Sequence, residues 1–154
     1  MPDAHNVVHA TSIALNGRAA LICGPSGSGK SDLALRCLMQ GGNHLVKDQA
    51  ELVADDYTVL RVDKGEVFLS APGSIRDRLE VRGIGVVPVK AIEEARLVLV
   101  VELTQARHIE RLPDPLPRRE IAGVSFPVLR LAAFEASAAP KLLLMLEQID
   151  RLEA

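Results

Sequence analysis

The hydrophobic positions of this chain fall mainly in short runs separated by glycine, proline and polar residues, a pattern that indicates several short strands. The clearest strand is Arg96 to Leu103, which contains five consecutive apolar residues. Asn16-Gly17 separates Thr11 to Leu15 from Ala19 to Cys23 and supplies the positive φ angles of a tight hairpin turn. We therefore expect these two segments to pair as antiparallel strands.

A second hairpin is predicted from Tyr57 to Val62 and from Val67 to Ala71, joined around Asp63 to Glu66. Two hairpins argue against a sheet built only from alternating strands and helices, and favour a mixed sheet. Other predicted strands are Leu52 to Ala54, the extended segment Leu79 to Val87, and Val124 to Leu131. The expected fold class is α/β, with a mixed β-sheet flanked by helices.

Helical patterns are fewer. One covers Asp32 to Gln40 and should stop at Gly41-Gly42, because glycine adopts the left-handed conformation that ends helices. Pro140 suits the first turn of a closing helix. Its predicted apolar stripe consists of Leu142, Leu143, Leu146 and Ile149. Short helical segments are also predicted at Gly73 to Leu79 and Ala91 to Ala95, and Thr104 to Glu120 reads as an exposed, proline-rich loop.

The connection between the first hairpin and the first helix matches the phosphate-binding motif G-x-x-x-x-G-K-[ST]. Its residues are Gly24, Pro25, Ser26, Gly27, Ser28, Gly29, Lys30 and Ser31. Glycines let several backbone N–H groups point into one hollow, to which the N-terminus of the following helix adds positive charge. Lys30 then reaches the outer phosphates, and the Ser31 hydroxyl is placed to ligate magnesium. The alternative is a glycine-rich turn without a ligand.

Composition narrows the function classes. The chain has 154 residues, 48% of them hydrophobic, which suits one globular domain spanning residues 1–154. Its formal net charge of −2 predicts neither a nucleic-acid groove nor an anionic membrane as partner. The two cysteines, Cys23 and Cys37, indicate neither a disulfide framework nor a metal site. No signal-like or membrane-spanning run is present, so we expect a soluble, cytoplasmic protein.

Transfer of a phosphoryl group needs more than a phosphate loop, and two segments supply carboxylates and arginine. Asp55-Asp56 follows a short apolar strand, where one carboxylate could accept the proton of an attacking hydroxyl and the other could hold magnesium. Side chains alternate along a strand, so only one of them should face the phosphate loop. If the next segment is extended, Glu80 and Arg82 share one of its faces, where Glu80 could bind metal and Arg82 phosphate, although its glycines imply a backbone bend or close approach. An acidic turn and a surface ion pair are the non-functional alternatives.

Together these segments resemble the bacterial HPr kinase/phosphorylase family, in particular its catalytic C-terminal domain. The resemblance rests on Val8-His9-Ala10, Gly24 to Ser31, Leu52 to Asp56, and the family's distinctive signature at Leu79 to Val87. It covers roughly residues 7 to 131 and implies the family's PEP-carboxykinase-like, phosphate-loop fold. The chain is similar to short members from alphaproteobacteria, which lack the N-terminal domain of full-length members.

The resemblance implies an ATP-dependent serine kinase of the phosphocarrier HPr, with a reverse reaction in which inorganic phosphate yields pyrophosphate. His9 is then the active-site histidine, Lys30 the phosphate-loop lysine, and Asp55 or Asp56 the base that becomes the acid in reverse. Ser31 and Glu80 hold Mg²⁺, and Arg82 touches phosphate. Arg111, in the proline-rich loop, is the best match for a further family arginine, although Arg107, Arg118 and Arg119 share that loop.

Two departures from the family pattern bear on function. The segment Pro127 to Leu131 lacks a glycine usual in a region used for dephosphorylation, which affects the phosphorylase prediction more than the kinase prediction. The link Asn43 to Glu51 is also longer than usual. Family members assemble as hexamers, so a homo-oligomer is one option for this chain. The alternative functions are a small-molecule kinase with the same loop and a regulatory module that binds nucleotide without transferring phosphate.

Overall fold

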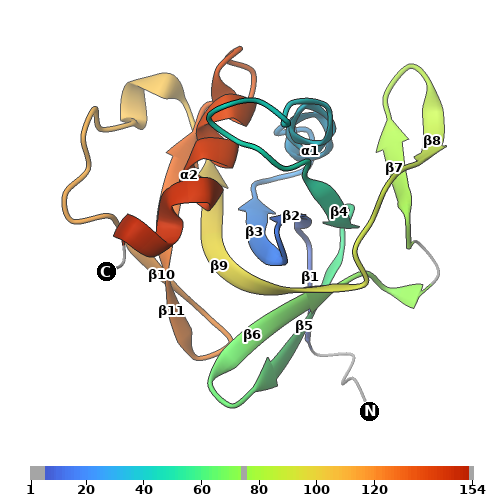
Figure 1. Ribbon diagram of the computed structural model, residues 1–154, viewed down its shortest axis with the longest axis horizontal. Coiled ribbons are helices and arrows are strands. Elements are labelled where there is room, and N and C mark those ends of the chain that lie inside the picture. The colour runs from blue at the N-terminus through green and yellow to red at the C-terminus, as the bar shows by residue number, and fades with distance from the viewer. Residues whose placement is uncertain (1–5, 74–75, 153–154) are drawn as a thin grey trace.

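A curled mixed sheet with two helices on one side forms the body of the protein (Figure 1). The computed structural model describes residues 6–73 and 76–152. The strands are β1 (Val7–Val8), β2 (Thr11–Leu15), β3 (Arg18–Cys23), β4 (Glu51–Ala54), β5 (Thr58–Asp63), β6 (Glu66–Ser70), β7 (Arg78–Val81), β8 (Gly85–Pro88), β9 (Glu94–Leu103), β10 (Arg118–Ile121) and β11 (Val124–Leu131). The helices are α1 (Lys30–Met39), the short 3-10 turn Ala106–His108, and α2 (Ala138–Leu152).

The strand that leads into the phosphate loop lies in the middle of the sheet. The strand order is β1-β5-β6-β9-β3-β2-β4, and β11 also pairs with β9. β9 runs parallel to both β3 and β11, whereas β2 is antiparallel to β3 and to β4. Because parallel strands end at the same edge of a sheet, the segments that follow β3, β9 and β11 meet there.

The central strands are covered on both faces, which explains their nearly continuous apolar sequences. Ala20 and Ile22 of β3 belong to a core cluster shared with α1 and α2. Ala19 and Leu21, the alternate positions, belong to a second cluster inside the curl of the sheet, with residues of β6 and β11. These two cores hold the phosphate loop between rigid elements.

The helices use their predicted apolar positions. Leu33, Ala34 and Cys37 of α1 are buried, as are the four residues of the predicted stripe on α2. Burial raises the pKa of the Cys37 thiol from its ordinary value of 9.0 to about 12, so this thiol stays protonated at neutral pH. Cys23 and Cys37 are both free. No helix in the described part of the chain combines the length and the hydrophobicity needed to cross a membrane.

Both hairpins, the central strand and the two long helices are as predicted, but the short helical segment predicted at Ala91 to Ala95 is wrong, and the one predicted at Gly73 to Leu79 is described only in part, with Gly73 in a 3-10 conformation. Residues 91–93 are not helical; Ala91 forms a bridge with Leu52, and β9 begins at Glu94. Of the segment predicted as helix at Gly73 to Leu79, residues 74 and 75 lie outside the described part, and Arg78 already belongs to strand β7. At Ala91, hydrogen bonding to a neighbouring strand overrode weak local helix propensity. The loop predicted up to Glu120 is likewise shorter, since β10 begins at Arg118 and pairs with β11.

Candidate active site

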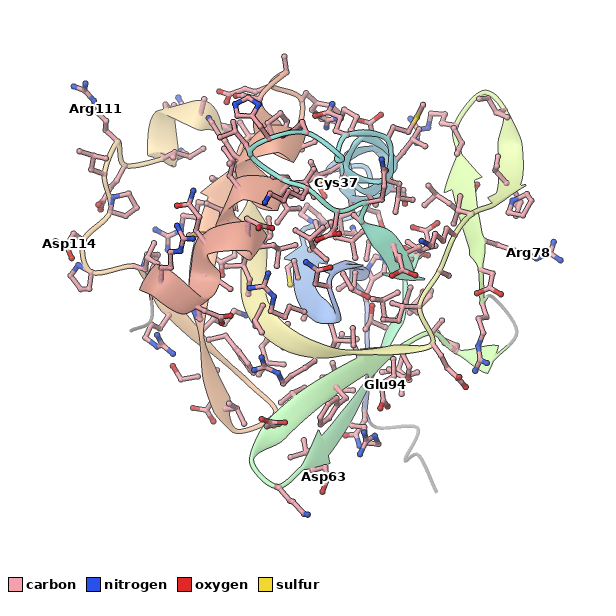
Figure 2. The ribbon with its side chains drawn as sticks, viewed as in Figure 1. Cys37, Asp63, Arg78, Glu94, Arg111 and Asp114 are labelled. Carbon is pink, nitrogen blue, oxygen red and sulfur yellow. The ribbon has the colours of Figure 1, made fainter. Side chains whose placement is uncertain are left out.

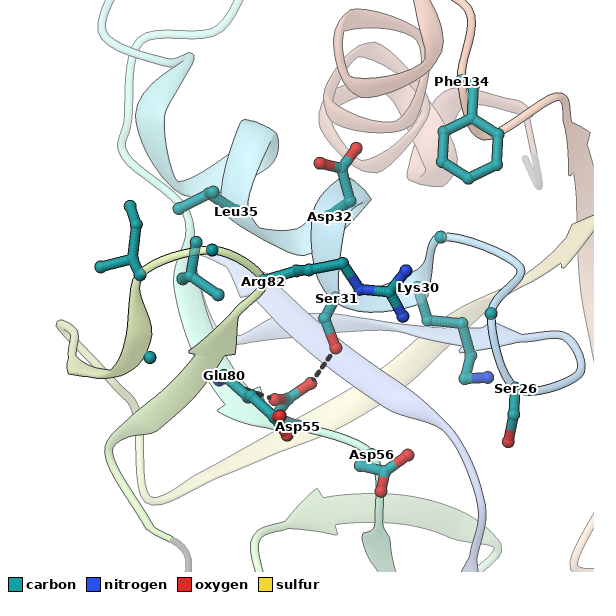
Figure 3. A pocket seen from close by; sticks show the side chains of 16 residues that line it. Ser26, Lys30, Ser31, Asp32, Leu35, Asp55, Asp56, Glu80, Arg82 and Phe134 are labelled. Atoms are coloured by element: carbon teal, nitrogen blue, oxygen red, sulfur yellow. Dashed lines mark hydrogen bonds between the residues drawn. The ribbon is translucent and has the colours of Figure 1, made fainter.

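A cavity of about 760 Å³ opens beside the phosphate loop, and most of the predicted site residues line it (Figure 3). The loop supplies Ser26, Gly27 and Gly29, α1 supplies Lys30 and Ser31, and the end of β4 supplies Asp55 and Asp56. The hairpin β7–β8, a separate two-stranded sheet, forms the opposite wall with Glu80 and Arg82. Three segments far apart in sequence, the phosphate loop with α1, the end of β4 and the β7–β8 hairpin, therefore converge on one space.

The phosphate loop has the backbone that its glycines permit. Gly27 and Gly29 have φ angles of +80° and +98°, and Gly29 precedes the first helical residue. A Cβ atom at Gly24 would lie 2.6 Å from the Ser28 Oγ atom, so a larger residue there would require the Ser28 side chain to move. The Lys30 Nζ atom donates hydrogen bonds to the carbonyl oxygens of Gly24 and Pro25, at 2.7 and 3.0 Å. The Lys30 side chain thus folds back over the loop, and its ammonium group binds the carbonyl oxygens at the start of the loop.

Asp55 is held by hydrogen bonds from three elements. Its Oδ1 atom accepts from the Ser31 Oγ atom at 2.6 Å and from the Thr11 Oγ1 atom at 3.3 Å. Its Oδ2 atom accepts from the backbone N–H of Glu80 at 3.1 Å. The residue is only 8% exposed. Asp55 therefore ties the helix that carries Ser31 to the hairpin that carries Glu80 and Arg82.

Asp56 points to a different partner although it is the next residue. Its φ angle of +68° turns the chain out of the strand direction. The His9 Nε2 atom donates to the Asp56 Oδ1 atom at 2.7 Å, and the His9 ring lies 5.2 Å from the Tyr57 ring. Both side chains of the His9–Asp56 pair are well exposed. As predicted, only one of the two aspartates contacts the phosphate loop, and the other is oriented by His9 at the cavity's edge.

The charges around the cavity suit a phosphate group accompanied by a cation. Lys30 and Arg82 are opposed by four carboxylates, so the lining side chains sum to a formal charge of −2. A bare polyphosphate would be repelled by this set, whereas a divalent cation would offset it. No cluster of three or more metal-binding side chains occurs among the described residues. Ser31, Asp55 and Glu80 fit a Mg²⁺ ion whose remaining ligands come from phosphate and water, as is usual for this ion.

Two arginines were predicted to contact phosphate, and the structure places them far apart. Arg82 lines the cavity, and Figure 3 shows its side chain directed from the hairpin toward the phosphate loop. Arg111 is exposed on the proline-rich loop, on the far side of α2 from the β7–β8 hairpin (Figure 2), and lines another cavity with residues of β11 and α2. The structure thus brings together the other predicted site residues but not Arg111, whose catalytic role stays a prediction.

Thr11 and Phe134 were not identified from sequence. Thr11 orients Asp55 and accepts a hydrogen bond from the Asp56 backbone N–H at 3.1 Å. In the sequence, Thr11 is only a polar residue at the start of an apolar strand, and this pattern does not predict which residue it contacts. Phe134 belongs to no sequence motif. It reaches the cavity because the segment after β11 lies at the same sheet edge as the phosphate loop.

The fold and the cavity define a phosphate-loop α/β domain with paired carboxylates opposite the loop. The model of the HPr serine kinase C-terminal domain family matches residues 3–145, and the chain belongs to this family. This match confirms the family resemblance drawn from the sequence motifs.

Individual relatives agree with the family assignment. The chain is 35% identical over 132 residues to the HPr kinase/phosphorylase of Caldicellulosiruptor bescii, covering 79% of this chain and 40% of that protein. It is 33% identical over 162 residues to the HPr kinase/phosphorylase of Leptothrix cholodnii, covering 92% of this chain and 47% of that protein. The chain therefore spans less than half the length of these curated relatives.

A solved structure confirms the fold. The structure of the Hpr(Ser) kinase/phosphatase from Coxiella burnetii matches with a TM-score of 0.76 at 22% sequence identity. The match covers 96% of this chain and 91% of that chain. The predicted fold class, a mixed sheet with a phosphate loop and flanking helices, is therefore correct.

Proposed function

We propose that this domain transfers the γ-phosphoryl group of ATP to a serine of an HPr-type phosphocarrier protein. The observation that carries the proposal is the convergence of Lys30, Ser31, Asp55 and Asp56 on one open cavity. Related proteins of greater length are named HPr kinase/phosphorylase, which supports the same substrate. Because the reaction consumes ATP, we place it in the cytoplasm.

In the proposed reaction, Lys30 and Arg82 bind the phosphate oxygens and offset the charge of the transition state. The serine hydroxyl attacks the γ-phosphorus, the bond to the bridging oxygen breaks, and ADP leaves. Mg²⁺, when bound, would neutralise phosphate charge; Ser31, Asp55 and Glu80 are the residues that would hold it.

We assign the base to Asp56 and a holding role to Asp55. Asp55 accepts three hydrogen bonds and is nearly buried between Thr11, Ser31 and the hairpin, so an acceptor hydroxyl has less access to it than to Asp56. Asp56 is exposed at the cavity edge and is oriented by His9. Its carboxylate would take the proton of the serine hydroxyl.

The same residues support the reverse reaction. Inorganic phosphate would attack the phosphoserine phosphorus, the bond to the serine oxygen would break, and pyrophosphate would form. Asp56, protonated in this direction, returns its proton to the serine oxygen. We propose this phosphorylase activity as the second half of the function.

The test is to incubate the protein with ATP, Mg²⁺ and the HPr of the same organism and to measure phosphoserine by intact mass. Lys30→Ala should lower the rate by at least about 100-fold, the usual effect of losing one group that stabilises transition-state charge. Lys47→Ala, which changes an exposed lysine away from the cavity, is the matched control. Nucleotide binding without any mass change in HPr would contradict the kinase proposal and favour a regulatory module.

A further inference from the structure

One aromatic side chain beside the phosphate loop takes no part in the core. The chain has only three phenylalanines. Phe126 is buried, and the Phe68 ring packs against the Arg61 guanidinium group at 4.6 Å. Phe134 is 73% exposed. A single exposed apolar residue does not by itself indicate a function, so the role of Phe134 is inferred from its surroundings.

The backbone that carries Phe134 is firmly attached to the phosphate-loop helix. Arg36 of α1 donates hydrogen bonds to the carbonyl oxygens of Ala133 and Glu135, one on each side of Phe134. Arg36 is itself paired with Asp32 on the same helix, at 2.9 Å. The backbone on both sides of Phe134 is therefore attached to the helix that follows the phosphate loop.

The ring also lies directly over the loop. A Cβ atom added to Gly29 would be 2.9 Å from the Phe134 Cζ atom and 3.1 Å from the Ala133 Cβ atom. Figure 3 shows Phe134 above the loop, on the opposite side of the cavity from Asp55. The ring therefore lies beside the space that a phosphate group in the loop would occupy.

Phe134 separates the phosphate cavity from a second cavity of about 700 Å³, because it lines both. The second cavity is formed by the segments that follow β3, β9 and β11, including Pro25, Gln105 and Ala132. These are adjacent parallel strands, and ligands of open α/β sheets bind outside such carboxyl ends. Its volume lies in the range of small-molecule sites.

The lining of the second cavity suits a planar group without negative charge. The described residues around it include no lysine or arginine; its titratable side chains are His108 and Glu135, so it has less to offer a phosphate than the cavity that contains Lys30 and Arg82. It combines apolar surface from Leu103 and Phe134 with the polar side chains of Thr104 and Gln105. A nucleobase has an aromatic face and polar edges, and aromatic side chains are its common stacking partners.

We propose that Phe134 stacks against the base of the bound nucleoside triphosphate, with the base in the second cavity and the phosphates in the loop. This inference rests on the proposed use of ATP but not on the identity of the phosphoryl acceptor. In this arrangement the phosphate loop binds the phosphates and Phe134 binds the base. The loop leads directly into α1, and Arg36 of α1 bonds to the backbone on both sides of Phe134.

The chain has no tryptophan, so one introduced at this position reports on stacking directly. In Phe134→Trp, MgATP should quench the fluorescence, whereas magnesium tripolyphosphate, which has no base, should leave it nearly unchanged. Leu112→Trp, at an exposed residue of the proline-rich loop, is the matched control and should respond to neither. Equal quenching by both ligands would mean that the ring senses only the loop and would overturn the proposal.

Affinity gives a second measurement. Phe134→Ala should weaken MgATP binding by about 5- to 100-fold, the range expected for loss of one base–aromatic stack, and leave tripolyphosphate binding unchanged. Phe134→Tyr should restore ATP binding. Unchanged ATP affinity in Phe134→Ala, or an equal loss for both ligands, would refute stacking.

These measurements need no HPr, so they separate the two proposals. ATP binding that depends on Phe134 without HPr phosphorylation would leave the stacking inference intact and refute the kinase function. A Phe134→Ala variant with normal ATP affinity but a raised KM for HPr would refute stacking and assign the ring to acceptor docking.

Discussion

At the scale of residues, two adjacent aspartates with the same chemistry have different surroundings. Asp55 continues the direction of β4 and is held by Thr11, Ser31 and the Glu80 backbone. Asp56 has a positive φ and turns outward to His9. A carboxylate with engaged oxygens serves to hold groups in place, whereas an exposed one can exchange a proton.

Exchange of each aspartate for asparagine should separate these roles. Asp56→Asn keeps the shape but removes the base, so turnover should fall by about 10²- to 10⁴-fold while MgATP binding is retained. Asp55→Asn removes negative charge beside Ser31 and should weaken MgATP binding. Calorimetric binding and the HPr mass assay measure the two effects. The opposite pattern would reverse the assignment.

At the scale of elements, the site depends on hydrogen bonds between strands that are distant in sequence. Thr11 on β2 is fully buried and bonds to both Asp55 and the Asp56 backbone. Thr58 on β5 is equally buried, but its hydroxyl bonds to the Ala10 carbonyl oxygen and to Ser12. The two threonines therefore offer a matched pair: Thr11 bonds to both aspartates, whereas Thr58 bonds to Ala10 and Ser12 and to neither aspartate.

Thr11→Val and Thr58→Val should each lower the free energy of unfolding by about 1–3 kcal/mol, because each leaves buried polar groups without partners. Urea unfolding measures this loss. Only Thr11→Val should also slow phosphoryl transfer, by at least about tenfold, since it frees the Asp55–Asp56 turn and misplaces the reacting groups. Equal activity of the two folded variants would show that Thr11 supports the fold but does not position the aspartates.

At the scale of the whole molecule, α1 and α2 cover one face of the sheet. Because α1 directly follows the phosphate loop, its packing in the core with α2 and β3 fixes the position of the loop. Leu146 is fully buried in the core that contains residues of both helices and of β3. α2 also begins shortly after Phe134, and the Ala138 N–H bonds to the Glu135 carbonyl oxygen. Packing of α2 thus supports both the core and the turn over the loop.

Leu146→Ala should destabilise the protein by about 2–5 kcal/mol, through lost burial and the cavity that remains. Met39→Ala, at a residue that is 77% exposed on α1, should change stability by less than about 0.5 kcal/mol. Chemical denaturation of both variants provides the measurement. A loss below about 1 kcal/mol for Leu146→Ala would mean that α2 contributes little to the core.

Much of this organisation was predictable because its causes are local. Asn16-Gly17 defines a hairpin turn, and the glycines of Gly24 to Ser31 define a phosphate loop. Strand alternation predicted that Asp55 and Asp56 diverge, but β4 ends at Ala54, and it is the positive φ of Asp56 that separates them. The short segment at Ala91 was predicted as helix and is not, because it pairs with Leu52 on a strand far away in the sequence. Pairing of that kind leaves no local signal.

The sequence by itself determined the phosphate loop, the carboxylates and the family, because each depends on residue types at close spacing. Only the tertiary structure decided which aspartate contacts Ser31, that Arg111 lies outside the cavity, and that Phe134 stands over Gly29. The position of Phe134 depends on the order of β11, β9 and β3 in the sheet, and the contact of Asp55 with Ser31 depends on the pairing of β4 with β2. The phosphate loop is encoded locally, but the site around it is made by strand pairing.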